Sequence, residues 1–253
     1  MAVVVTLNEW INKNAPALKN VMRAVIPRVM RDAFAQKKFK ELIKSESYAE
    51  TFSNIYDRNW WGSAESISGC GSELARTSQV RDGLVKFIES HNIRTLIDAP
   101  CGDCNWIVDV IKTTKIIYFG YDIVPKLVEN NRLAFPQYEF DVADILNMKL
   151  KPSDAWLCRD ALFHFPNDAV FRVLEAFEKS DVKFLLTTHF KSVKFHTDIE
   201  FGQYRPINIC CEPFNWPEPD HLIYDGDDKD TDRYLGVWVN PSLRVSASLD
   251  SNT

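Results

Sequence analysis

The stretch that decides the fold is Thr95-Leu96-Ile97-Asp98-Ala99-Pro100-Cys101-Gly102-Asp103. Its apolar first half predicts a short buried strand over residues 94–98 that ends on the carboxylate of Asp98. The chain then turns sharply around Gly102, and the following pattern predicts a helix over residues 105–112. A strand, a tight turn and a helix in this order indicate a parallel α/β unit with a ligand-binding turn at the end of its strand.

A second strand pattern also ends on an acid. Residues 116–121 are apolar and lead directly to Asp122. A tight turn lets the backbone approach a nucleotide-type ligand, and an acid after the second strand can accept hydrogen bonds from ribose hydroxyls. The two strands together therefore predict a site for a nucleotide-type cofactor.

Residues 77–242 continue to alternate helical and strand patterns. This alternation predicts a doubly wound α/β domain, with a mostly parallel sheet and helices on both faces. After residue 190 the long helices stop, and short strands near 207–210 and 234–239 predict an antiparallel ending. The other predicted elements are helices over 78–90, 125–134 and 167–179, and strands over 138–142, 154–158 and 183–189.

Three segments lie outside this domain. Residues 1–46 predict a basic, amphipathic helical extension, because nine Lys/Arg and three acids in residues 1–44 contrast with a whole-chain charge of -5. This basic face is either solvated, which we favour, or meets an anionic surface. Residues 47–76 are aromatic and rich in Ser and Gly, and their length predicts an active-site lid. Residues 243–253 predict a polar tail.

Composition narrows the class of protein. The chain has 253 residues, 45% hydrophobic and 26% charged, as is typical of a globular protein. No apolar run reaches the roughly 20 residues that span a bilayer, and the start lacks the pattern of a signal peptide. Six cysteines without a regular framework indicate reduced thiols, so we expect a cytoplasmic protein. The five histidines show no paired spacing, and we expect no metal site.

Over about residues 78–240 the chain resembles class I S-adenosylmethionine-dependent methyltransferases. The first strand of that family ends in an acid and a Gly-x-Gly-x-Gly-like turn, whose three Gly positions are here Pro100, Gly102 and Cys104. The missing glycines argue against NAD, whose pyrophosphate requires close backbone contact, whereas S-adenosylmethionine has no pyrophosphate. The resemblance implies a Rossmann-like, seven-stranded sheet with an antiparallel C-terminal strand.

The resemblance also implies a set of cofactor contacts. Asp122 corresponds to the family's ribose-binding acid, and Asp144 to the residue that meets the adenine amine. Helix capping is the alternative role for Asp98 and Asp122. The implied cofactor-binding residues are Asp98, Pro100, Cys101, Gly102, Asp103, Asp122, Ile123, Asp144, Ile145 and Arg159.

Methyl transfer to a hydroxyl requires a positioned base. Asp160 and His164 follow the fourth strand, so we expect His164 to act as the base with Asp160 orienting it, or Asp160 itself to be the base. His189, at the end of the fifth strand, is the second candidate. The alternative is a His164 packed under the loop and an Asp160 that caps a helix.

Three further side chains are candidates for substrate binding. Trp60 and Trp61 offer flat faces that could stack on a sugar ring or on adenine, or could pack against the sheet edge. Arg205 could hold a carboxylate or phosphate through its planar fork, or form a structural ion pair.

A narrower resemblance concerns the acceptor. The 98–103 turn, residues 158–164 and residues 61–72 are similar to a microbial and viral subgroup associated with methylating sugar hydroxyls of surface glycans, including rhamnose-type residues. Three alternatives stay open. They are a small-molecule methyltransferase with a nitrogen or carboxylate acceptor, an RNA methyltransferase using the basic segment 13–44, and a non-catalytic cofactor-binding assembly partner. The acidic body makes nucleic acid the less favoured partner, and the oligomeric state is left open.

Overall fold

The computed structural model describes residues 39–41, 47–227 and 231–243. The chain divides into two units, residues 1–44 and 45–253, and every element below belongs to the second. Most of the predicted basic extension and nearly all of the predicted polar tail lie outside the described residues. Within the described ranges, no helix combines the length and the apolar character that crossing a membrane requires.

Seven strands form one sheet in the order β3-β2-β1-β4-β5-β7-β6. Six of them run in the same direction, and β7 pairs antiparallel with both of its neighbours. The predicted mostly parallel, Rossmann-like sheet with an antiparallel C-terminal strand is confirmed. The strands are β1 (Thr95–Asp98), β2 (Ile117–Asp122), β3 (Glu139–Val142), β4 (Ala155–Cys158), β5 (Phe184–Phe190), β6 (His221–Tyr224) and β7 (Arg233–Val239).

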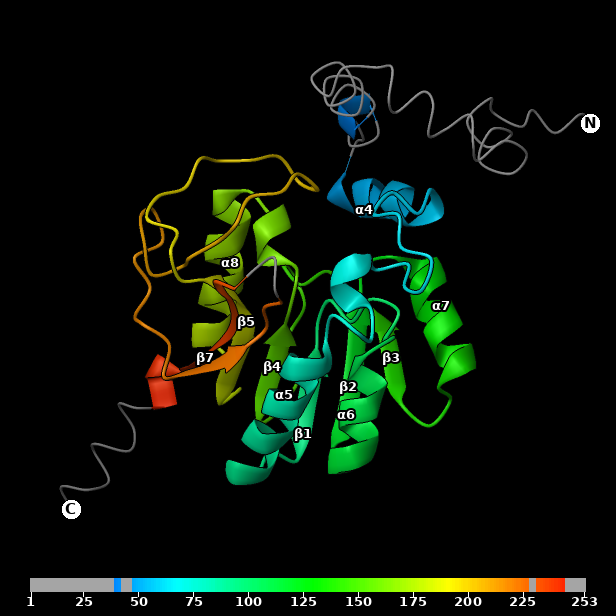
Figure 1. Ribbon diagram of the computed structural model, residues 1–253, viewed down its shortest axis with the longest axis horizontal. Helices are drawn as coiled ribbons and strands as arrows, with labels where there is room; N and C mark the ends of the chain where they lie inside the picture. The colour runs from blue at the N-terminus through cyan, green and yellow to red at the C-terminus, as the bar shows by residue number, and fades with distance from the viewer. Residues whose placement is uncertain (1–38, 42–46, 228–230, 244–253) are drawn as a thin grey trace, which may run out of the picture. The chain divides into compact units, whose positions relative to one another are not determined.

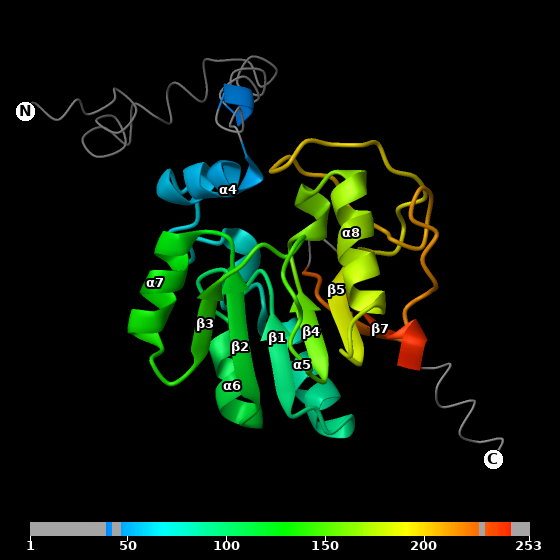
Figure 2. The same ribbon diagram turned by 180° about the vertical axis from the view of Figure 1, so that it is seen from behind.

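Helices cover both faces of this sheet. Because neighbouring residues of a strand face opposite sides, Leu96 packs in the cluster that holds α5, α6 and α7, whereas Ile97 packs in the cluster that holds α8. Figure 1 shows α5 and α6 in front of the strands, and Figure 2 shows α8 from the opposite side. These helices are α5 (Ser78–Ser90), α6 (Ile107–Thr114), α7 (Pro125–Ala134) and α8 (Asn167–Glu178).

The prediction of a strand near 207–210 is wrong. Residues 191–220 contain no helix or strand, and the last pairing is made by β6 and β7 instead. Ile207 and Ile209 are buried because they pack on the α8 side of the sheet, which explains their strand-like pattern. Partners inside and next to the loop satisfy its polar groups, for example the Phe190 N–H that donates to the Ile207 carbonyl at 2.8 Å.

The segment predicted as a lid contains two helices. It holds helix α4 (Tyr48–Asp57), whose N-terminus is capped by the Ser47 hydroxyl, and the 3-10 helix η1 (Cys70–Ser72). Figure 1 shows α4 above the ends at which β1, β2 and β3 terminate. This arrangement places α4 over the edge of the sheet where ligands of α/β proteins bind.

The core on the α8 side can be tested with a matched pair of substitutions. Leu174 on α8 is 2% exposed, whereas Leu133 on α7 is 76% exposed. Leu174→Ala should lower the free energy of unfolding by about 2–5 kcal/mol, because it removes buried methyl groups and leaves a cavity. Leu133→Ala should change it by less than about 0.5 kcal/mol. Urea denaturation measures both, and equal effects would contradict this placement of the core.

Candidate functional site

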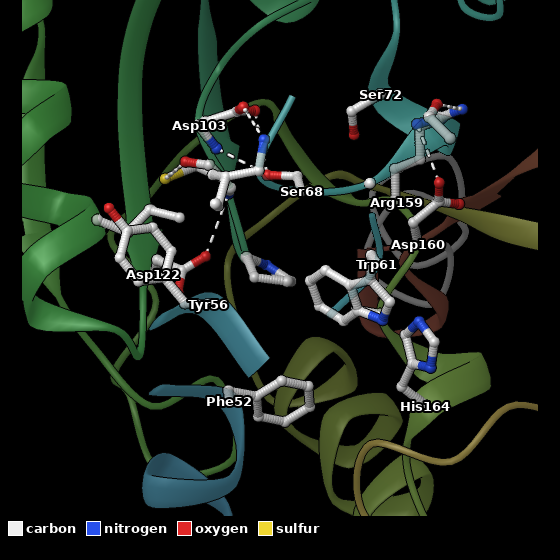
Figure 3. A pocket seen from close by; sticks show the side chains of 18 of the residues that line it. Phe52, Tyr56, Trp61, Ser68, Ser72, Asp103, Asp122, Arg159, Asp160 and His164 are labelled. Carbon is white, nitrogen blue, oxygen red and sulfur yellow. Dashed lines mark hydrogen bonds and ion pairs between the residues drawn. The ribbon is translucent and has the colours of Figure 1, made fainter. Parts of the chain in front are cut away.

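A cavity of about 780 Å³ lies at the carboxyl ends of the parallel strands and under α4. Its volume is in the range of small-molecule sites. All ten residues expected to bind the cofactor line it, together with Trp61, Asp160 and His164. Figure 3 shows Asp122 and Asp103 on one side of this cavity, and Asp160 and His164 on the other.

The turn after β1 is bound directly to the end of β2. Gly102 has a φ of +55°, and a Cβ there would lie 2.3 Å from the Ser68 Oγ, so the position requires glycine. Its N–H donates to the Asp122 Oδ2 at 3.1 Å, and the Val124 N–H donates to the Oδ1 at 3.0 Å. A carboxylate has about four lone-pair positions, so Asp122 can accept further bonds from a ligand.

Two carboxylates in this half of the cavity are deeply buried. Burial raises the pKa of Asp122 to about 6, against the opposing effect of the backbone N–H groups. Burial likewise raises the pKa of Asp98 to about 7, although the Tyr118 hydroxyl donates to its Oδ2 at 2.7 Å. A bound cation or hydroxyl donor would favour the ionised form of both groups.

Asp103 is bound by several groups of the chain at the wall of the cavity. Its carboxylate accepts hydrogen bonds from the Ser66 hydroxyl at 2.8 and 3.0 Å, the Ile67 N–H at 2.9 Å and the Ser68 hydroxyl at 3.0 Å. These three donors occupy most of its roughly four acceptor positions. Asp103 therefore lines the cavity while its carboxylate holds the loop 66–68 over the turn, and its expected contact with the cofactor stays a prediction.

Asp144 binds helix α4 through a hydrogen bond from the Tyr48 hydroxyl. Its carboxylate accepts hydrogen bonds from the Leu146 N–H at 2.9 Å, from the Asn147 amide and from the Tyr48 hydroxyl of α4. Burial, with the hydrogen bond to Asp144, raises the pKa of Tyr48. Sequence reasoning missed this contact, because Tyr48 and Asp144 are distant in the chain and only the fold brings them together.

Two arginines and two aspartates alternate in a buried charge cluster, formed by Arg159, Asp160, Asp225 and Arg233. Arg159 makes a bidentate pair with Asp225 at 2.9 Å for both bonds, and its third nitrogen lies 3.1 Å from the Asp160 Oδ2. Arg233 contacts the Oδ1 of Asp160 and lies 3.1 Å from the Asp225 Oδ2. This cluster joins the end of β4 to the strands β6 and β7.

The charge cluster changes the role expected of Asp160. Burial alone would raise the pKa of Asp160, but Arg159 and Arg233 outweigh it and hold the pKa well below its usual range. The Thr188 hydroxyl also donates to the Oδ1 at 2.9 Å. Asp160 is therefore a poor proton acceptor, and its carboxylate does not orient His164 by a hydrogen bond, because both oxygens are held by the arginines.

A backbone carbonyl orients His164 instead. Its Nδ1 lies 2.8 Å from the Gln203 carbonyl oxygen, which can only accept, so Nδ1 carries the proton and Nε2 carries the lone pair. The ring stacks on Trp61 with centroids 5.5 Å apart and planes at 24°. Burial lowers the pKa of His164, so the ring is neutral at pH 7 and can accept a proton at Nε2.

Three candidates lie outside the cavity. His189 is 1% exposed on β5 and packs edge-on against Trp238, because its neighbour Thr188 faces the site and successive strand residues alternate. Arg205 belongs to the loop 191–220, where its guanidinium lies over the Phe214 ring and the residue is buried. Trp60 does not line the cavity. The expected roles of these three at the site are corrected.

The cavity wall contains aromatic residues that sequence reasoning did not select. Tyr48, Phe52 and Tyr56 recur every fourth residue along α4, a helical spacing that could have revealed their common face. Phe163, Phe165 and Tyr204 have no comparable local signal, because a 3-10 helix and a loop bring them together. Among the described residues, no cluster of His, Cys, Asp or Glu has the arrangement of a metal site.

Comparison with known proteins identifies the fold through structure only. The sequence matches no protein-family model, and a search of curated proteins finds no significant match. Magnesium protoporphyrin IX methyltransferase from Synechocystis PCC 6803 with bound SAM gives a TM-score of 0.53 at 11% identity, over 78% of this chain and 99% of that chain. The same enzyme with bound SAH gives 0.52 at 10% identity, over 77% and 100%. Human N-acetylserotonin methyltransferase in complex with SAM gives 0.45 at 12% identity, over 72% and 51%. The two higher scores, both for the Synechocystis enzyme, show that this chain shares the fold of that enzyme.

The role of Asp103 in holding the loop gives a direct prediction. Asp103→Ala should speed amide hydrogen exchange across residues 64–70, because the Ile67 N–H and two serine hydroxyls lose a charged acceptor worth about 1.5–3 kcal/mol per bond. Hydrogen exchange with mass spectrometry measures the change. The exposed Asp82 of α5 provides the control, since Asp82→Ala should leave that peptide unchanged. Unaltered exchange in Asp103→Ala would show that the loop is held by other contacts.

Proposed function

We propose that this chain is an S-adenosylmethionine-dependent methyltransferase that methylates a hydroxyl group, of a sugar or glycan of the rhamnose type. One observation carries the proposal. A single cavity in this fold holds the Gly102–Asp122 turn on one side and, on the other, a His164 whose Nε2 is left with the lone pair. The turn with Asp122 suits the binding of a nucleoside, and His164 suits the removal of a proton from the acceptor.

The residues present fit this cofactor. Asp122 keeps free acceptor positions for ribose hydroxyls. The Oδ1 of Asp144 accepts one N–H bond, so it keeps a second acceptor position for the adenine amine. Ile123 and Ile145 line the cavity next to these acids and offer apolar contact to a base. When bound, S-adenosylmethionine supplies an electrophilic methyl group on a sulfonium sulfur.

The protein's own chemistry centres on His164. Its Nε2 takes the proton of the acceptor hydroxyl as the oxygen attacks, and the Gln203 carbonyl holds the Nδ1 proton throughout. The negative charge of Asp160 favours the imidazolium that forms, although it does not touch the ring. Trp61 fixes the plane of the imidazole by stacking on it. Proton removal is therefore assigned to His164 alone.

The walls around His164 suit a ring with apolar faces. Phe52, Trp61, Phe163, Phe165 and Tyr204 all line this part of the cavity. A sugar ring presents C–H faces to such walls and hydroxyls to the base. This composition supports a sugar acceptor more than an extended polar chain.

Cofactor binding should depend on Asp122 and on pH. Asp122→Asn should weaken S-adenosylmethionine binding by about 10- to 100-fold, because hydrogen bonds to a charged acceptor are worth about 1.5–3 kcal/mol. In the wild type, affinity should be full well above pH 6 and fall as the pH drops through about 6, where half of the Asp122 carboxylates take up a proton. Because Asp98 titrates nearby, the diagnostic quantity is the difference between wild type and variant in calorimetry. Asp141→Asn, at an exposed acid of β3, is the control, and unchanged affinity in Asp122→Asn would refute the ribose contact.

Turnover should depend on His164 while cofactor binding does not. His164→Gln should lower kcat by about 10²- to 10⁴-fold, the usual contribution of a general base, and leave cofactor affinity intact. In the wild type, kcat should rise with pH through a value below the usual histidine pKa, because burial lowers the pKa of His164. Acceptor-dependent formation of S-adenosylhomocysteine from nucleotide-sugars, glycans and RNA is the assay, with the exposed His221→Gln as control. Full activity of His164→Gln would remove its role as base. Cofactor binding without turnover of any acceptor would favour a non-catalytic protein.

A further inference from the structure

We infer that the acceptor is an uncharged molecule, and that the cavity excludes acceptors that carry phosphate or carboxylate near the reacting hydroxyl. The inference deepens the proposed function and rests on it. It comes from the charges around the cavity, which show that every cationic side chain lining it is already paired with a carboxylate.

The three lining arginines are each neutralised. Arg159 and Arg233 share Asp225 and Asp160 in the charge cluster. The Nε of Arg76 lies 3.2 Å from the Asp227 Oδ2, and its Nη1 donates to the Asp225 carbonyl at 2.8 Å. No lysine occurs among the residues that line the cavity. An anionic group would therefore find no cation that is not already held by an acid.

The balance of charge around the cavity is acidic. Its lining residues include three guanidinium groups and seven acids, of which only Asp98 has a pKa raised by burial to as much as about 7. The acids are Glu73, Asp98, Asp103, Asp122, Asp144, Asp160 and Asp227. A phosphate moved out of water into such surroundings loses hydration and meets like charge, and both effects weaken its binding. A cationic sulfonium meets no such penalty there. S-adenosylmethionine also carries a carboxylate, but its sulfonium and ammonium groups give it a net positive charge, so the acidic cavity suits this cofactor beside a neutral acceptor.

The preference for a neutral acceptor indicates at which step of glycan synthesis the methyl group is added. Activated sugars carry a nucleoside diphosphate, which the acidic cavity disfavours, whereas a sugar joined to an uncharged chain or aglycone has no such group. The methyl transfer therefore follows the glycosyl transfer that releases the nucleoside diphosphate. The substrate class is a neutral glycoside with a free hydroxyl.

The first test uses pairs of acceptors that differ only in charge. Each 6-deoxyhexose or hexose is offered as its methyl glycoside and as its nucleoside diphosphate derivative, and kcat/KM is measured from S-adenosylhomocysteine formation. We expect the methyl glycoside of a productive pair to be favoured at least about tenfold. An equal or greater kcat/KM for the nucleotide-sugar would overturn the inference. Cofactor binding without turnover of any pair would overturn it together with the hydroxyl acceptor, whereas loss of cofactor binding would instead refute the proposed function.

The second test needs no acceptor. Inorganic pyrophosphate is titrated by calorimetry into the complex with S-adenosylhomocysteine at constant ionic strength. Asp227→Asn removes the carboxylate paired with Arg76, and because the Asp227 side chain is 38% exposed the variant should fold normally. It should bind pyrophosphate about two- to fivefold more tightly than the wild type, and Asp82→Asn should not. Pyrophosphate binding that is equally tight in wild type and Asp227→Asn would contradict the inference that the paired carboxylates neutralise the arginines of the cavity.

Discussion

The hydrogen bond that Asp122 accepts from the Gly102 N–H joins the turn after β1 to the end of β2. The parallel pairing of these strands, with Asp98 opposite Gly120, brings their acids to the same edge of the sheet. The turn between them has no room for a side chain at Gly102. The loop 66–68, held by Asp103, and the cavity beneath it are built on this turn. A Cβ at this position would displace the Ser68 side chain and with it the loop.

The charge cluster supports the opposite side of the cavity. It ties three segments that are distant in sequence, since Arg159 also donates to the Gly71 carbonyl at 3.0 Å. Removing one partner of such a cluster leaves an uncompensated buried charge, which typically costs about 3–5 kcal/mol. The same pairing decides the chemistry of the site. It holds the pKa of Asp160 low, so Asp160 is a poor proton acceptor, and the base in the proposed reaction is therefore His164.

Much of the fold could be predicted from the sequence, and parts of the site could not. The alternation of apolar strands and amphipathic helices was enough for the sheet, and the predicted helices 78–90 and 125–134 coincide with α5 and α7. The 207–210 pattern misled because isoleucines buried in a loop resemble those of a strand. The spacing of Asp160 and His164 indicated contact between them, whereas each found a different partner, far along the chain, once the cluster and the Gln203 loop had packed.

The sequence by itself determined the class of sheet and the turn at Gly102, because both follow from local periodicity and from the conformational freedom of one glycine. The tertiary structure alone decided which side chains reach the cavity and in what state. Arg159 meets Asp225 across 66 positions of sequence, and Arg233 meets Asp160 across 73. Contacts over such separations leave no local pattern, because they arise only when the sheet brings the ends of β4, β6 and β7 together.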